Sequence, residues 1–261
     1  MHLERLWRLA WCLALLIGCG RHRVYPVALP RADITVALDT TGTCRTINEA
    51  LGRAREGNVI LVMPGVYREH VKLTDIGHVT LVGLNPATTV VDASGCYAAV
   101  EIRTDSNRVS GFTLRNADSH GVWVRDGHQV IERCLVTDNG ERGIYLSALT
   151  GNASARIQHC TVADNAETGI HAARDSSGVI ISDCILAFNA RGVVTDHSTG
   201  RMTVKRNCVY NRLLDFDQVL PGDSNIVADP RFASRERGDY RLTRASPCLG
   251  AGAGRTNLGC F

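Results

Sequence analysis

Aromatic and charged residues recur through the middle of the chain in a pattern that suits sugar binding. Glu101, Trp123, Tyr145 and His171 each follow an apolar residue in a segment of alternating character. If these segments are strands, the four side chains point outward while their neighbours point to the core. Aromatic rings stack on the apolar faces of sugars, and charged groups hydrogen-bond hydroxyls and carboxylates. We therefore predict a carbohydrate-binding site at these four residues.

His171 and several polar residues that follow the first set in the chain supply candidates for catalysis. The candidates are Arg103, Arg125, Asp126, His171 and Asp196. These residues are the expected participants if the protein is a lyase, hydrolase or epimerase acting on acidic polysaccharide. Calcium-dependent chemistry needs clustered carboxylates, whereas the two aspartates occur at different points of their segments. We expect a noncatalytic protein without a cofactor or metal, and Ca²⁺ only under the enzyme alternative.

The aromatic residues also have a purely structural interpretation. Side chains stacked on one face of a sheet stabilise it by about 0.2 to 1 kcal/mol per pair without binding a ligand. Under that interpretation the protein is a surface scaffold. His120, His128 and His159 are interpreted as ordinary surface histidines.

An internal repeat must position these side chains. Four glycines recur at intervals of 22, 26 and 23 residues, at Gly121, Gly143, Gly169 and Gly192. An asparagine ends each repeat, at Asn139, Asn165, Asn189 and Asn211. The repeats are rich in Val, Ile, Cys and Thr rather than set in a leucine frame, which predicts short strands wound into an all-β solenoid. Glycine and asparagine are expected at its corners, because both tolerate left-handed backbone.

Equivalent residues of such coils stack at the interstrand spacing of ~4.8 Å. Three repeats share an Ile-x-x-Cys phrase, ending at Cys134, Cys160 and Cys184. We expect an interior column of free thiols there, because parallel Cβ vectors strain a disulfide; a metal site is the alternative. The asparagines should form a corner ladder that hydrogen-bonds along the axis.

The remaining cysteines fit the repeat less well. Cys208 is off the common spacing, which predicts a local slip. Cys248 and Cys260 flank a glycine-rich loop and are the best candidates for a disulfide. The pairing of Cys44 and Cys96 stays open.

Three stretches carry a family resemblance. They are Thr-Ile-Asn-Glu-Ala-Leu at 46–51, Val-Ile-Leu-Val-Met-Pro-Gly-Val-Tyr-Arg-Glu at 59–69 and Val-Thr-Leu-Val-Gly at 79–83. Together with the repeat they resemble right-handed parallel β-helix proteins of the pectin-lyase type. The resemblance implies a single-stranded right-handed parallel β-helix, with coils over 59–227, an N-terminal helical cap over 34–58 and an irregular C-terminal cap over 228–261.

Sequence signals at both ends agree with capping of exposed strand edges. Thr46 and Glu49 form a capping box for a helix over about 46–56 that stops at Gly57. The segment from Asp229 to Phe261 is rich in proline and glycine, and we expect it to close the other end with one short strand at most.

One phrase points to a specific enzyme family. Residues 65–69, Gly-Val-Tyr-Arg-Glu, match the Gly-x-Tyr-x-Glu phrase of pectin methylesterases. The other phrases of that family, including its catalytic Asp-bearing stretches and a Leu-Gly-Arg-Pro-Trp stretch, do not occur. We therefore interpret the phrase as a fold feature, with Tyr67 packing near the N-terminal cap.

The first residues are typical of an export signal. Residues 1–18 combine two arginines with an apolar stretch too short to span a bilayer. The stretch ends in Leu-Ile-Gly-Cys, which resembles a bacterial lipobox and implies a lipoprotein anchored through Cys19, with 19–33 as a tether. A plain secretory signal is the alternative. We expect the outer membrane or cell surface as its location and the membrane as a partner.

Net charge makes nucleic acid an unexpected partner. The chain has 29 Lys plus Arg against 26 Asp plus Glu, a balance of +3, and no block of like charges. Oligomeric state is not indicated by the sequence.

Overall fold

The computed structural model describes residues 31–147, 153–173, 176, 178–196 and 202–261. The predicted signal peptide 1–18, the lipidation candidate Cys19 and most of the tether 19–33 lie outside the described residues. No helix in the described ranges is long and apolar enough to cross a membrane.

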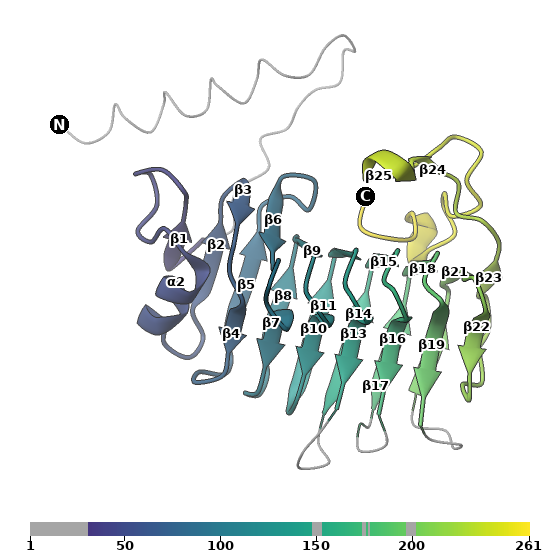
Figure 1. The fold of residues 1–261 in the computed structure, drawn as a ribbon, viewed down its shortest axis with the longest axis horizontal. Helices are drawn as coiled ribbons and strands as arrows, with labels where there is room; N and C mark the ends of the chain where they lie inside the picture. The colour runs from purple at the N-terminus through teal and green to yellow at the C-terminus, as the bar shows by residue number, and fades with distance from the viewer. Residues whose placement is uncertain (1–30, 148–152, 174–175, 177, 197–201) are drawn as a thin grey trace, which may run out of the picture. The chain divides into compact units, whose positions relative to one another are not determined.

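Three parallel sheets extend along the described chain, and each coil contributes a strand to each of them in turn (Figure 1). Sheet A contains β1 (Ile34–Val36), β2 (Val59–Val62), β5 (Thr80–Gly83), β8 (Arg108–Ser110), β11 (His128–Glu132), β14 (Ser154–Gln158), β17 (Val179–Ser182) and β20 (Met202–Lys205). Sheet B contains β3 (Gly65–Tyr67), β6 (Thr89–Asp92), β9 (Thr113–Arg115), β12 (Leu135–Thr137), β15 (Thr161–Ala163), β18 (Ile185–Ala187), β21 (Cys208–Tyr210) and β23 (Ile226–Val227). Sheet C contains β4 (Val71–Leu73), β7 (Ala98–Ile102), β10 (His120–Val124), β13 (Arg142–Leu146), β16 (Thr168–Ala172), β19 (Arg191–Thr195) and β22 (Leu214–Asp217).

The alternation of apolar residues determines which side of each strand faces inward. In β10, Val122 and Val124 are fully buried, whereas Trp123 between them is partly exposed. Ile131, Ile157 and Ile181 are register partners on successive strands of sheet A and belong to one continuous core. The predicted all-β parallel solenoid is therefore confirmed.

An asparagine ladder occupies one corner of the coils, as predicted. Asn139 Nδ2 donates to Asn165 Oδ1 at 2.8 Å, and the next two steps of the ladder each measure 3.0 Å. A Cβ on Gly143 would lie 2.4 Å from Val162 Cγ1, 2.7 Å from the Gly169 carbonyl oxygen and 2.9 Å from Asn165 Nδ2, so the close approach of the coils at this corner requires glycine. Left-handed backbone belongs instead to the residue before the asparagine, such as Asp164 with φ of 56°. The left-handed backbone expected at the corner asparagines is therefore absent from Asn139, Asn165, Asn189 and Asn211, although Asn116 one coil earlier has it, with φ of 59°.

The repeat cysteines stack inside the coils. Cys134, Cys160 and Cys184 are fully buried and unpaired, and burial raises the pKa of the Cys134 and Cys160 thiols. One coil further on, Asn207 takes the place of the cysteine, and its Oδ1 accepts the Cys184 amide at 2.9 Å. Cys208 is thereby displaced by one residue, which is the predicted slip.

Helix α2 (Ile47–Arg53) begins at Thr46, as predicted, because the Thr46 hydroxyl accepts the Glu49 amide at 3.1 Å. The Glu49 carboxylate accepts the amide of Arg45 at 2.9 Å, so the second hydrogen bond of the expected capping box goes to a neighbouring residue. The helix ends at Arg53 rather than at residue 56. Segment 34–58 also contains β1, which pairs in parallel with β2.

The Gly-Val-Tyr-Arg-Glu stretch fastens this helix to the first coil. Tyr67 is buried, its hydroxyl donates to the Met63 carbonyl at 2.9 Å, and burial raises the pKa of Tyr67 to about 12. The Glu69 carboxylate accepts the amides of Ile47 and Asn48 at 2.8 and 2.9 Å. Both residues of the phrase thus serve the fold, which agrees with its interpretation from the sequence.

The C-terminal segment lies along the outer side of sheet B. It contains the antiparallel pair β24 (Phe232–Ser234) and β25 (Asp239–Leu242) and the 3₁₀ turns η2 (Arg235–Arg237) and η3 (Ala253–Arg255). Tyr240 packs against Leu135, and its hydroxyl contacts Thr137 at 2.8 Å and Asp164 at 2.9 Å. The segment therefore reaches back across several coils (Figure 1), instead of only closing the last one.

This course of the chain also decides which cysteines meet. Cys248 lies beside Cys208 in a small cluster, where the Cys208 thiol donates to the Ala228 carbonyl at 3.2 Å and the neighbouring Cys248 raises the pKa of Cys208. Cys260 packs elsewhere, beside the cluster of Leu135 and Tyr240. The pair predicted from sequence, Cys248 with Cys260, is thus not the pair that the structure brings together.

Candidate functional site

The predicted carbohydrate-binding residues form one continuous column on the outer side of sheet C. Glu101 on β7, Trp123 on β10, Tyr145 on β13 and His171 on β16 are register partners in that order. The column continues in the other direction to Lys72 on β4, the partner of Glu101. Neighbouring strands lie ~4.8 Å apart. We call these five residues, with the adjoining Arg103, Arg125 and Arg142, the column surface.

Glu101 anchors the first part of the column surface. Its side chain is only 7% exposed, and it accepts from Arg103 Nε at 2.7 Å and Arg125 at 3.1 Å. His70 Nε2 lies 3.5 Å from the other carboxylate oxygen. Burial acts to raise the pKa of Glu101, but the hydrogen bonds from the two arginines outweigh it, so the pKa lies below its ordinary value. Glu101 is therefore held as a carboxylate, without a proton to donate.

Burial has the opposite consequence for His70. Its Nε2 is enclosed and makes no hydrogen bond within the described residues. Desolvation lowers the pKa of His70, although the charge of Glu101 acts against it. The ring is thus neutral near neutral pH.

The aromatic part of the column is larger than the sequence indicated. Tyr97 and His120 join it, with ring centroids 5.1 Å between Tyr97 and Trp123 and 4.8 Å between His120 and Tyr145. Tyr97 is 50% exposed, whereas His120 is 1% exposed. Burial lowers the pKa of His120 to about 4. The interpretation of His120 as a surface histidine was therefore wrong; its place directly before the repeat glycine Gly121 is the signal that was missed.

Arginines cover parts of the aromatic column. The guanidinium carbon of Arg125 lies 4.3 Å from the Trp123 ring centroid, and that of Arg142 lies 4.7 Å from the Tyr145 centroid. The Trp123 indole also donates to the Ser147 hydroxyl at 2.8 Å. Arg142, the register partner of His120, was not among the predicted residues. These contacts hold the rings in fixed orientations, with polar groups at their edges.

A second charged group lies at the other end of the column. His171 Nε2 is 3.0 Å from Asp196, and its Nδ1 accepts from Arg142 Nε at 3.1 Å. Arg142 also pairs with Glu141 at 2.6 Å. Asp196 follows β19, which is four steps from the Glu101 strand β7 in sheet C, or ~19 Å at ~4.8 Å per step.

The structure distributes the five catalytic candidates over these places. Arg103 and Arg125 share Glu101, and His171 pairs with Asp196. Asp126 lies in the turn after β10, where its carboxylate accepts the amide of the next residue at 2.9 Å. In the described ranges no three His, Cys, Asp or Glu side chains are arranged to hold a metal ion. The arrangement suits contact with an extended polar ligand better than attack on a single bond.

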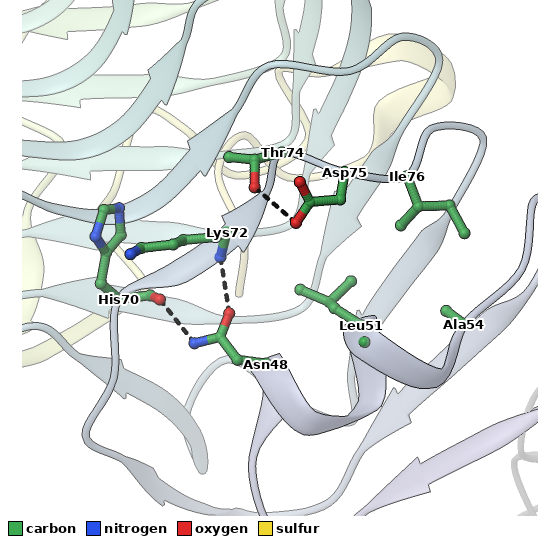
Figure 2. A pocket seen from close by; sticks show the side chains of 9 residues that line it. Asn48, Leu51, Ala54, His70, Lys72, Thr74, Asp75 and Ile76 are labelled. Atoms are coloured by element: carbon green, nitrogen blue, oxygen red, sulfur yellow. Dashed lines mark hydrogen bonds between the residues drawn. The ribbon is translucent and has the colours of Figure 1, made fainter.

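A pocket of about 870 Å³ lies at the Lys72 end of the column surface, between α2 and β4. Asn48 on α2 replaces the missing next strand: its side chain donates to the His70 carbonyl at 2.7 Å and accepts the Lys72 amide at 3.0 Å. Leu51 and Ile76 supply apolar lining. Figure 2 shows the Lys72 side chain extending toward the His70 ring, with Thr74 and Asp75 on the other side of the pocket. No motif or repeat in the sequence indicated this pocket.

Comparison with known proteins agrees with the parallel β-helix fold. Residues 98–215 match the family described as "Right handed beta helix region". The Escherichia coli protein ybhc is 12% identical, with a TM-score of 0.57, and the alignment covers 78% of this chain and 71% of that one. A mannuronic acid specific polysaccharide family 6 lyase from human gut microbiota is 13% identical, with a TM-score of 0.52, covering 67% of this chain and 49% of that one.

Sequence relatives are shorter matches. The "Probable pectinesterase/pectinesterase inhibitor 58" of Arabidopsis thaliana is 32% identical over 111 residues, which are 39% of this chain and 19% of that protein. The "Probable pectinesterase/pectinesterase inhibitor 23" of the same plant is 33% identical over 79 residues, which are 28% of this chain and 14% of that protein. The chain thus matches less than a fifth of the length of either relative. With the parallel register of its three sheets, these findings show that the chain has a right-handed parallel β-helix fold of the pectin-lyase-like type, with the family match spanning residues 98–215.

Proposed function

We propose that the column surface binds a polysaccharide and that the protein does not transform it. The observation that carries the proposal is the register of sheet C, which stacks Glu101, Trp123, Tyr145 and His171 on consecutive strands. A linear ligand lying along the coil axis meets rings, arginines and carboxylates in regular order. Rings suit the apolar faces of sugars, and the charged groups suit their hydroxyls and carboxylates.

Two features of the site support binding over catalysis. Glu101 is engaged by two arginines, which leaves it neither protonated nor free to act as a base. The Asp196 carboxylate, which pairs with His171 at the far end of the column surface, lies ~19 Å from Glu101 along sheet C, so these two carboxylates cannot act on one bond.

The sequence likeness to pectinesterases favours one alternative, a hydrolase, lyase or epimerase acting on acidic polysaccharide. Its candidates are Arg103, Arg125, Asp126, His171 and Asp196. A screen of uronic-acid polymers, followed for saturated and unsaturated ends and for released methanol, with and without Ca²⁺, tests this alternative. Turnover that is lost in the His171→Ala and Arg125→Ala variants would replace the binding proposal by an enzymatic one.

Trp123 provides the direct test of binding. The chain has three tryptophans, and replacing Trp7 and Trp11 by phenylalanine leaves Trp123 as the single indole reporter. We expect oligosaccharides to change its fluorescence in a saturable way, and the Trp123→Ala variant to bind about tenfold more weakly by calorimetry.

The matched control is Tyr210→Ala, which removes a ring that is 43% exposed on sheet B. Its affinity should equal that of the unaltered protein. Equal affinities for the Trp123 and Tyr210 variants would remove the column from the binding site and leave the scaffold interpretation.

We further propose that residues 1–18 direct export and that lipid on Cys19 anchors the protein in the bacterial cell envelope, at the outer membrane or cell surface. The support is the order of residues in the leader. Labelling of the full-length protein with radioactive palmitate tests this, with Cys19→Ala as the variant expected to lose label. Label that persists in the variant would contradict lipidation at this residue.

A further inference from the structure

The pocket between α2 and β4 lies where the column surface ends. β4 is the terminal strand of sheet C, and α2 follows it through the Asn48 hydrogen bonds. A linear ligand lying along the column therefore runs past Glu101 and Lys72 into this pocket. Its volume of about 870 Å³ lies within the range of about 300–1,000 Å³ that is usual for small-molecule sites.

We propose that this pocket binds a sugar residue bearing a carboxylate, a uronic acid, at the end of the polysaccharide chain; this rests on the proposed function of the column surface. Lys72 is an exposed lining residue of the pocket, and its side chain extends toward the His70 ring at one side of the lining (Figure 2). Arg103 directly follows β7, the strand that pairs with β4. Its side chain is half exposed and forms an ion pair with Glu101. A carboxylate placed beside Lys72 gains an ion pair that a neutral sugar cannot make.

The remaining lining matches the rest of a sugar ring. Leu51 and Ile76 offer apolar contact for the C–H face of the ring. Asp75, on the opposite side from Lys72 in Figure 2, is a hydrogen-bond acceptor for hydroxyls and already accepts from Thr74 at 3.2 Å. A cation at one end and a carboxylate at the other orient an acidic sugar in one direction.

Lysine content makes the test unusually specific. The whole chain contains two lysines, Lys72 in the pocket and Lys205 on β20 in sheet A. Reductive methylation of the full chain with ¹³C-formaldehyde keeps both charges and labels both side chains for NMR. Trigalacturonate should shift the Lys72 signal in a saturable way and leave the Lys205 signal unchanged.

Charge specificity is tested with the fully methyl-esterified trigalacturonate, which has the same sugars without charge. We expect it to bind about tenfold more weakly than the acid. The Lys72→Met variant, altered at an exposed side chain, should bind both ligands with equal affinity, while Lys205→Met should keep the difference.

The outcomes separate the two proposals. If both ligands bind and change Trp123 fluorescence while the Lys72 signal stays still, or if Lys72→Met retains the preference for the acid, the pocket proposal is overturned and the column surface stands. If neither ligand binds, the pocket proposal is overturned, and the proposed function of the column surface then depends on the Trp123 fluorescence test with other oligosaccharides.

Discussion

The asparagine ladder should be a major source of stability, and Asn165 is its best test. Asn165 is fully buried, and its Oδ1 accepts from both the backbone amide and the Nδ2 of Asn139, at 3.3 and 2.8 Å. Its Nδ2 donates to the carbonyls of Val136 and Ala163 and to Asn189 at 3.0–3.2 Å. The Asn165→Ala substitution leaves the backbone amide of Asn139 and one N–H of its Nδ2 buried without an acceptor, while the other N–H of Nδ2 keeps the Thr137 carbonyl.

Each buried unsatisfied group costs about 1–3 kcal/mol, so we expect this variant to lose about 4 kcal/mol of unfolding free energy. Asn165→Asp keeps the acceptor but buries a charge, and should lose at least as much. Urea unfolding followed by circular dichroism measures both. The control is Asn257→Ala, an exposed site whose change should stay below about 1 kcal/mol. A loss at Asn165 no larger than at Asn257 would refute the view that the ladder is closed to water.

Three further predictions concern His120, the pair Cys208 and Cys248, and Tyr240. The pKa of His120 is about 4 in the folded protein and about 6.5 in the unfolded chain. Between these two pH values the unfolded chain binds a proton that the folded protein does not bind, so the free energy of unfolding falls as the pH falls from about 6.5 to about 4. His120→Phe should remove up to about 3 kcal/mol of that acid loss in urea unfolding, and an unchanged pH profile would contradict the assignment. Cys208 and Cys248 should form a disulfide when the reduced protein is treated with oxidised glutathione, and peptide mapping that links Cys248 to Cys260 instead would disprove the contact. Tyr240→Phe removes the hydrogen bonds to Thr137 on β12 and to Asp164 directly after β15. It should speed amide exchange in the C-terminal segment while exchange in the first coils stays the same; equal rates throughout would show that the hydroxyl does not hold the segment.

Much of the column could be predicted because the repeat is regular. A residue that directly follows an inward apolar residue after each glycine must occupy the same place on the next strand, as Trp123 and Tyr145 do. The buried thiols of Cys134 and Cys160 follow from the same regularity. Strand pairing is local to neighbouring coils, so spacing alone was sufficient.

Contacts between the coils and segments outside the repeat could not be predicted from the sequence. The C-terminal segment touches coils far earlier in the chain, through Tyr240 and Asp164, and no periodic signal marks such a contact. The pairing of Cys208 with Cys248 depends on it. Tyr97 and His120 were missed because they lie in or beside a bend, where strict alternation does not specify the direction of a side chain.

Coil-by-coil construction has a consequence for how this surface changes in length. Because the backbone returns to the same corner after every winding, a duplication or loss of one whole winding keeps the neighbouring windings in contact. Such an event lengthens or shortens the outer face by a single step of ~4.8 Å and adds or removes one side chain at each position. The length of polymer that the outer face can contact can therefore change among descendants of this protein. The side chains that each remaining winding contributes to that face stay the same.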